Sequence, residues 1–170
     1  MKKLFGLMLV LIAFAANSQE RKINKGETWY RIYNNKDLEM KTDERFVFST
    51  LIIDGKNLVF EYYMRADDYD DIADDEYMER VVFEVPAKAT SFYYHDSTLR
   101  AAFYRGCFCP DRGWHALGDG FIKGKKINAT TWQVEIDAMT KATPNRTSGP
   151  VTKKFKATFV LQTNPAKKKK

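Results

Sequence analysis

The chain has 170 residues, of which 44% are hydrophobic, 14% aromatic and 29% charged, with a formal net charge of +6 at pH 7. This composition excludes a disordered polar chain and is typical of a globular domain with a substantial core. The basic excess does not indicate a nucleic-acid-binding protein, because six lysines at the two ends account for it and the remainder balances 22 basic against 22 acidic residues.

The first residues have the pattern of a cleaved export signal. Two lysines precede an uncharged apolar run over residues 4–16, and the small residues Ala16 and Ser18 stand at the positions that precede a cleavage site. The run is shorter than a bilayer-spanning helix, which needs about 20 residues. We therefore predict a secretory signal peptide over residues 1–18 and a periplasmic or secreted protein without a later membrane span.

The rest of the chain is predicted to be a single β domain over residues 19–166, followed by a basic tail at residues 167–170. This length supports one ordinary core and is too short for two. Residues 54–96 contain 12 acidic and 4 basic side chains, whereas residues 97–170 contain 15 basic and 4 acidic ones. The asymmetry favours an oppositely charged partner, head-to-tail self-association, or strands that neutralise each other within the fold.

Nine segments have the period-two alternation or the aromatic and β-branched enrichment of strands. In the last two, alternation places Trp132 and Ile136 on one face, and Phe155 and Phe159 on one face. Residues 44–53, the second of the nine segments, are apolar on both faces, which predicts a strand covered on two sides. The nine predicted strands are residues 28–33, 44–53, 57–64, 80–85, 91–95, 99–105, 120–127, 131–137 and 154–161.

Turn chemistry separates these segments. Asp54-Gly55 is the strongest hairpin signal, and Asp96-Ser97 predicts a second hairpin. Residues 34–37, Asn-Asn-Lys-Asp, also predict a turn, and residues 106–118 predict an irregular segment. The fold class that follows is all-β, an antiparallel β-sandwich or partly closed barrel of about nine strands, since alternation alone does not encode strand order.

An acidic run over residues 67–79 supplies the carboxylate oxygens that calcium prefers. Counting Asp68 as the first position of an EF-hand loop places Asp70, Glu76 and Glu79 at positions three, nine and twelve. Positions five and six lack the required ligand and glycine, so the EF-hand is rejected. An irregular calcium site at these four residues remains the alternative to the favoured interpretation, a solvated acidic connection, and no other cofactor is predicted.

Cys107 and Cys109 are expected to form a disulfide, because cysteines of exported proteins usually pair. In a regular strand their Cα atoms would lie near the roughly 7 Å limit for a disulfide, so a kinked backbone is required. A redox-active dithiol, and a metal site completed by His95 and His115, are the alternatives.

Aromatic side chains provide the candidates for ligand binding. Tyr63 and Tyr94 are out of phase with their apolar neighbours and are predicted to be exposed. Trp114 falls in the predicted irregular segment, with His115 beside it. These four residues are the predicted ligand-binding residues, and core packing is the competing interpretation of the other aromatic residues.

The sequence lacks the nucleophile elbow, the phosphate loop and the His-Glu-x-x-His pattern, and isolated acids such as Glu61 and Glu84 are predicted to face solvent. The leading hypothesis is therefore an exported bacterial envelope protein that acts as a non-enzymatic binding or interaction module. Its expected partner is another envelope protein, a small ligand or a glycan, and neither a nucleic acid nor a metal is required.

Two alternatives stay open. Residues 26–29, Gly-Glu-Thr-Trp, resemble the Gly-x-Trp start of lipocalins with the spacing changed by one residue. This does not assign the chain to that family, but a lipocalin-like carrier of a small ligand is the first alternative function. A hydrolase or thiol-redox enzyme is the second alternative. Whether the protein is an enzyme therefore stays uncertain, and a protein without enzymatic activity is favoured.

Overall fold

A computed structural model of the chain describes residues 23–43, 48–69, 72, 76–142 and 149–162. The predicted signal peptide and the basic tail lie outside these ranges.

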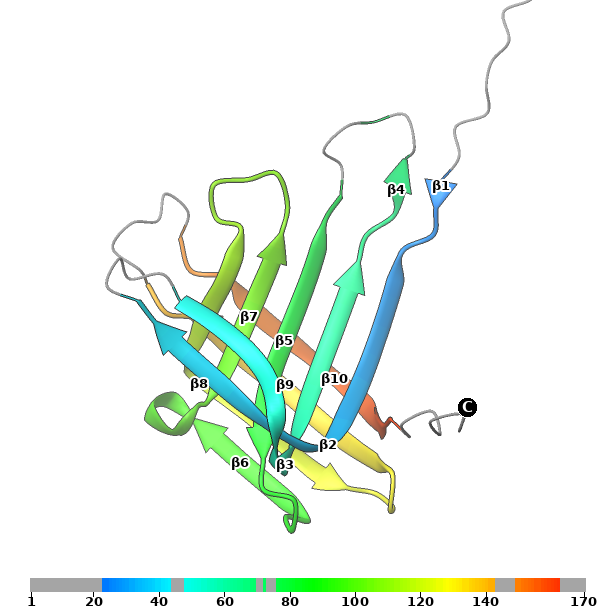
Figure 1. Cartoon of the computed structure of the whole chain (residues 1–170), viewed down its shortest axis with the longest axis vertical. Helices are drawn as coiled ribbons and strands as arrows, with labels where there is room; N and C mark the ends of the chain where they lie inside the picture. Colours follow the sequence, from blue (N-terminus) through cyan, green and yellow to red (C-terminus); the bar gives the residue numbers. More distant parts are fainter. Residues whose placement is uncertain (1–22, 44–47, 70–71, 73–75, 143–148, 163–170) are drawn as a thin grey trace, which may run out of the picture.

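The elements are β1 (Ile23–Asn24), β2 (Glu27–Thr42), β3 (Phe48–Arg65), β4 (Asp68–Tyr69), β5 (Met78–Val85), β6 (Ser91–His95), the 3-10 turn η1 (Asp96–Thr98), β7 (Ala101–Gly106), β8 (Gly113–Lys126), β9 (Thr131–Thr140) and β10 (Thr152–Leu161). The all-β prediction is confirmed (Figure 1). Within the described ranges, no helix has the length and apolar character needed to cross a membrane.

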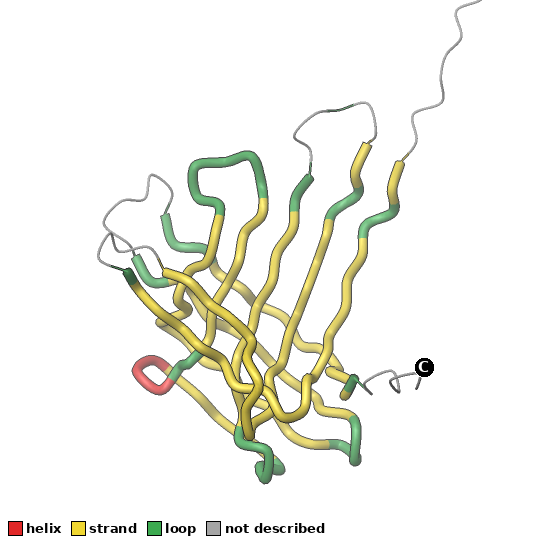
Figure 2. The backbone as a smooth tube through the Cα atoms, in the orientation of Figure 1, coloured by secondary structure: helices red, strands yellow, loops and turns green. Residues whose placement is uncertain are grey.

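Seven strands form a ring. In the order β8-β7-β5-β3-β2-β10-β9, each strand pairs with the next and β9 pairs again with β8, while β6 pairs with β8 alone. The pairings within the ring are antiparallel except that of β10 with β2, which is parallel and joins Val160 to Arg31 and Leu161 to Ile32. Of the two predicted architectures, the structure is thus the partly closed barrel (Figures 1 and 2).

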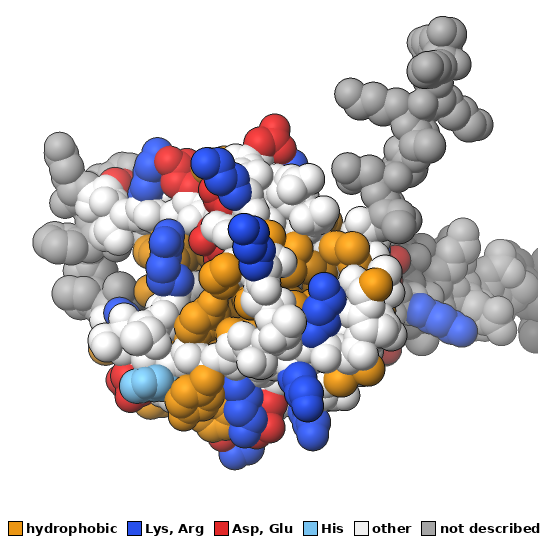
Figure 3. Space-filling view, turned by 90° about the horizontal axis from the view of Figure 1, so that it is seen from below, with side chains coloured by type: hydrophobic (Ala, Val, Ile, Leu, Met, Phe, Trp, Pro, Cys, Tyr) orange, Lys and Arg blue, Asp and Glu red, His pale blue; other side chains and the backbone are white. Residues whose placement is uncertain are grey.

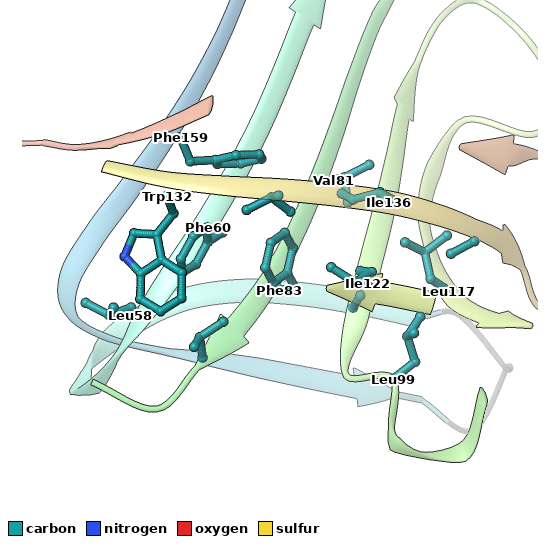
Figure 4. Packing of buried hydrophobic residues seen from close by; sticks show 14 of the residues in the cluster. Leu58, Phe60, Val81, Phe83, Leu99, Leu117, Ile122, Trp132, Ile136 and Phe159 are labelled. Atoms are coloured by element: carbon teal, nitrogen blue, oxygen red, sulfur yellow. The ribbon is translucent and has the colours of Figure 1, made fainter. Parts of the chain in front are cut away.

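The barrel interior is filled with apolar side chains, because alternate residues of each strand point inward. Along β9, every second residue is buried, as the alternation predicts. The ring centroid of Phe60 lies 4.9 Å from that of Phe83 and 5.5 Å from those of Trp132 and Phe159. Figure 4 shows these four side chains, which come from β3, β5, β9 and β10, gathered in one cluster. The core is therefore a packed interior rather than a lumen.

The longest hairpin is formed by β2 and β3, and its turn is not where the sequence predicts it. The two strands pair from Glu27 opposite Arg65 to Thr42 opposite Phe48, with a register shift at Lys36. The chain therefore reverses between Thr42 and Phe48, and Asp54-Gly55 lies inside β3. The prediction of a hairpin at Asp54-Gly55 is wrong.

Two stretches with turn chemistry, residues 34–37 and 54–57, lie opposite each other in this hairpin, where the register shifts. One oxygen of the Asp37 carboxylate accepts hydrogen bonds from the backbone N–H groups of Lys56 and Asn57. A Cβ atom on Gly55 would lie 2.0 Å from the Asp37 carboxyl carbon, so a larger residue would displace this carboxylate from its hydrogen bonds. Both strands bulge at the same level, and the hairpin bends there instead of ending.

Beyond this bend, the two strands form an arm, residues 36–42 and 48–54, which lies across the outer face of β3, β5 and β7 (Figure 1). Leu38 of the arm packs there with Val59, Val82 and Ala102, all of which are buried. The residues around this outer cluster are Met40, Phe48, Ile52 and Trp114. The arm thus gives the barrel a second, smaller core outside the ring.

Two acids that the sequence places in solvent are bound by neighbouring groups on the outer face of the sheet, and the arm supplies the partner of one of them. Glu84 accepts a hydrogen bond of 2.6 Å from the backbone N–H of Leu38. Glu61 is only 4% exposed and binds Arg80 and the Tyr33 hydroxyl. The prediction that Glu61 and Glu84 face solvent is therefore wrong, since the outer face of this part of the sheet is not a solvent face.

The arm itself is covered on one side only. Leu51 is 61% exposed and Ile53 is 41% exposed, whereas Thr50 is buried. The prediction of a strand covered on two sides over residues 44–53 is wrong for the described part of that segment, because it lies outside the ring.

The second predicted hairpin, at Asp96-Ser97, is also wrong. β6 and β7 both pair with β8 rather than with each other, and η1 offsets them along the same edge of β8. β8 begins at Gly113, so Trp114 and His115 lie on a strand and not in an irregular segment. A register shift between Leu117 and Gly120, which has a φ of 110°, bends β8 so that it reaches all three neighbours.

Candidate functional site

The arm leaves the outer face of β3, β5 and β7 uncovered near the end of the barrel that is uppermost in Figure 1. A surface groove of about 410 Å³ lies there, within the volume range of small-ligand sites. We call it the rim groove. Its lining residues are Tyr63, Arg65, Glu76, Tyr77, Met78, Gly106, Cys107 and Phe108.

Tyr63 forms a fixed aromatic wall of the rim groove. Its ring stacks on that of Trp29 with a centroid distance of 3.8 Å and an interplanar angle of 6°. The Arg31 guanidinium lies 4.1 Å from the Trp29 ring centroid. Because alternate residues of β3 face inward, Tyr63 faces outward and Tyr62 faces the core. The stack holds Tyr63 half-buried in one orientation, which reduces the entropy lost when a ligand binds.

Phe108 forms an opposite, exposed boundary of the rim groove. Its side chain is 78% exposed and lies between Cys107 and Cys109 in the sequence. The sulfur atoms of these cysteines lie within bonding distance, and their Cα atoms are 5.2 Å apart, inside the usual range for a disulfide. The backbone bends over residues 107–109, so the kink that the predicted disulfide requires is present.

Polar groups stand around this apolar surface. Arg65 is paired with Asp68 at the rim, and its side chain remains 43% exposed. Glu76 is exposed, and the Tyr77 hydroxyl donates a hydrogen bond to Glu79. The rim groove therefore combines an aromatic wall with an exposed cation and an exposed carboxylate, which is the composition of a site that binds through apolar contact and hydrogen bonds.

The other predicted ligand-binding residues lie elsewhere. Tyr94 is half-buried, stacks on Phe92 at 5.3 Å and packs against the core, and burial raises the pKa of its phenol. The ring of Trp114 lies beside the arm, 5.2 Å from the Arg80 guanidinium. His115 is 7% exposed, and its Nε2 lies 2.9 Å from the Asp111 carbonyl oxygen. The structure thus separates Tyr63 from the three residues grouped with it.

The described carboxylates of the predicted calcium site do not converge on one point in the structure. Asp68 binds Arg65, Glu76 lines the rim groove, and Glu79 points into the barrel. Asp70 lies outside the described residues. Among the described residues, no group of three or more histidine, cysteine, aspartate or glutamate side chains is placed to hold a metal ion.

A buried polar layer covers the apolar core below the rim groove. Glu79 is 6% exposed on the inner side of β5, and the Lys153 ammonium lies 2.5 Å from its carboxylate. The same ammonium lies 4.7 Å from the Phe103 ring centroid. This pair was not predicted, because Glu79 and Lys153 are 74 residues apart and only the alternation of each strand indicates that they face inward.

Tyr62, which packs on this core, makes stability sensitive to alkaline pH. Burial, followed by the charge of Glu79 and the nearby Tyr30 and Tyr77, raises the pKa of Tyr62 from 10.0 to about 12. Between these values the unfolded chain loses the proton and the folded chain retains it, so stability falls as the pH rises. We expect the urea-denaturation midpoint to decrease across this interval, and to decrease less steeply in Tyr62→Phe. Equal slopes in the two proteins would contradict this role of Tyr62.

Comparisons of the chain with protein-family models, with curated proteins and with solved structures find no match. The function is therefore inferred from the residues of the chain itself.

Proposed function

We propose that this protein is an exported, non-enzymatic binding module of the bacterial cell envelope, and that the rim groove holds its ligand. The observation that carries the proposal is the stacked pair of Trp29 and Tyr63, which presents a fixed aromatic surface beside exposed polar groups. An aromatic residue of the core does not line a groove, and an isolated aromatic residue on the surface is not held by a stacked neighbour. Tyr63 both lines a groove and is held by the Trp29 ring.

The ligand class that fits the rim groove is a glycan. The C–H faces of a pyranose ring pack on aromatic rings such as that of Tyr63, and its hydroxyl groups pair with charged and hydroxyl side chains. Arg65 and Glu76 provide such groups on the same groove. One open side and a volume of about 410 Å³ suit one or two sugar rings of a longer chain.

The filled core favours this proposal over a lipocalin-like carrier. Such a carrier holds its ligand inside the barrel, whereas here the large aromatic side chains Trp132, Phe60, Phe83, Phe103 and Phe159 are all at most 2% exposed and occupy the interior. A carrier function would require these side chains to leave the positions in which they pack.

The pairing of the buried acids favours binding over hydrolysis. Glu61 faces outward and binds Arg80, whereas Glu79 faces inward and binds Lys153. Glycoside hydrolysis uses two carboxyl groups that flank one bond, and these two acids lie on opposite faces of the sheet.

Affinity electrophoresis in gels that contain soluble polysaccharides tests the proposal. We expect at least one neutral polysaccharide to retard the protein, and Tyr63→Ala to weaken that binding roughly tenfold, since truncating an aromatic residue at the centre of a binding site commonly costs about 1–2 kcal/mol. The matched control is Tyr93→Ala, which removes an exposed tyrosine from β6, outside the rim groove.

Three results separate the interpretations. Retardation that Tyr63→Ala reduces and Tyr93→Ala preserves supports the rim groove. Equal effects of both substitutions would contradict it. Absence of retardation by every polysaccharide would overturn the glycan class.

A further inference from the structure

The outer face of β6, β8, β9 and β10, on the other side of the barrel, contains a second groove. Its volume is about 440 Å³. We call it the lysine groove. Its lining residues are Phe92, Tyr93, Lys123, Gly124, Lys125, Ile127, Gln133, Glu135 and Lys156. Tyr93, Lys125, Ile127 and Lys156 of this lining are exposed, so the groove is open to solvent.

Strand register accounts for the composition of the lysine groove. Tyr93 of β6 pairs with Lys123 of β8, Lys123 pairs with Glu135 of β9, and Glu135 pairs with Lys156 of β10. Residues directly opposite each other on neighbouring strands have side chains on the same face. These four side chains therefore form one row across the sheet, and Lys125 with Gln133 begins the next row.

The lysine groove has an excess of positive charge. Lys123 lies 3.1 Å from Glu135, which neutralises it. Among the described residues, neither Lys125 nor Lys156 has a carboxylate partner, and both side chains are exposed. Two ammonium groups therefore face the groove without a compensating anion.

The same groove also exposes apolar surface. Tyr93 and Ile127 are each 60% exposed, and the Phe92 ring lies against Gly124 below them. Viewed from the lower end of the barrel, apolar side chains are visible between lysine and arginine side chains (Figure 3). Exposed apolar surface next to uncompensated cations is suited to a ligand that is apolar over most of its length and anionic at one end.

We propose that the lysine groove binds an anionic amphiphile, a single molecule with an acyl chain or other apolar body and a carboxylate or phosphate head. The apolar body lies along Phe92, Tyr93 and Ile127. The anionic head lies between the ammonium groups of Lys125 and Lys156. This site is separate from the rim groove and does not depend on the glycan proposal.

Calorimetric titration of the purified protein with monomeric laurate tests this site. We expect laurate to bind, and dodecyltrimethylammonium and dodecyl maltoside, which carry a chain of the same length with a cationic or neutral head, to bind at least several-fold more weakly. The double substitution Lys125→Ala/Lys156→Ala is expected to weaken laurate binding roughly fivefold, as the loss of two partly exposed ion pairs predicts. Ile127→Ser is expected to weaken it as well, through lost apolar contact.

The matched control is Lys56→Ala/Lys88→Ala, which removes two exposed lysines outside the lysine groove. This control and Tyr63→Ala are expected to retain laurate binding. Equal weakening in the control would overturn the site, since the effect would then follow net charge alone. Equal binding of laurate and dodecyl maltoside would overturn the role of the two lysines. Binding to phosphatidylglycerol vesicles without binding of monomeric laurate would overturn the single-molecule ligand and assign the lysines to a membrane surface.

Discussion

Phe60→Ala is expected to destabilise the folded protein by about 3–5 kcal/mol, the range typical of a fully buried phenylalanine. The Phe60 ring is completely buried and meets rings from four other strands, those of Phe83, Phe92, Trp132 and Phe159. These partners are held by their own strands and do not close the space that the ring leaves, so the substitution produces a cavity as well as a loss of buried area. Urea denaturation followed by tryptophan fluorescence measures the change.

Phe108→Ala is the control for this prediction, because it removes the same side chain from a position that is 78% exposed. It is expected to change stability by no more than about 0.5 kcal/mol. If Phe60→Ala lowered the free energy of unfolding as little as Phe108→Ala, the rings would not form a packed core. The conclusion that side chains fill the barrel interior would then be wrong.

Glu79→Gln is expected to destabilise the protein by about 3–5 kcal/mol, because it leaves the Lys153 ammonium buried without a counter-charge. The Lys153 side chain is 15% exposed and that of Glu79 is 7% exposed, so water replaces the lost partner poorly. Glu79 also accepts a hydrogen bond from the Tyr77 hydroxyl, which the amide retains less well. Denaturation by urea at neutral pH gives the change in unfolding free energy.

Two further variants separate burial from charge. Glu135→Gln breaks the pair with Lys123, whose side chains are 37% and 46% exposed, and is expected to cost no more than about 1 kcal/mol. The double substitution Glu79→Met/Lys153→Met removes both buried charges together and is expected to recover most of the loss, since apolar residues of similar volume often replace a buried pair without cost. Failure of the double variant to recover stability would indicate that the polar layer is required for a reason other than mutual neutralisation.

The candidate site shows how far alternation predicts position. Period two places Tyr63 on the face opposite Phe60, and the structure brings Tyr63, Glu76 and Cys107 into one groove. Trp29 supports the Tyr63 ring because β2 pairs with β3 so that Trp29 stands opposite Tyr63. No local pattern in either strand contains that register, so the stacked pair was not predicted.

The amino-acid sequence alone predicts the class of the fold and the inner faces of β9 and β10, because the alternation of side chains along a strand is a local property of the backbone. Whether Asp54-Gly55 reverses the chain or bends it depends on residues that are distant in the sequence. Aspartate and glycine permit both, and the outcome depends on the turn-forming residues 34–37, which lie opposite them and bulge with them. The same bend places Leu38 of the arm on Glu84 and leaves the rim groove uncovered. Its physical basis is long-range: the free energy gained when the arm buries Leu38 on Val59 and Val82 depends on residues that are neighbours only after folding.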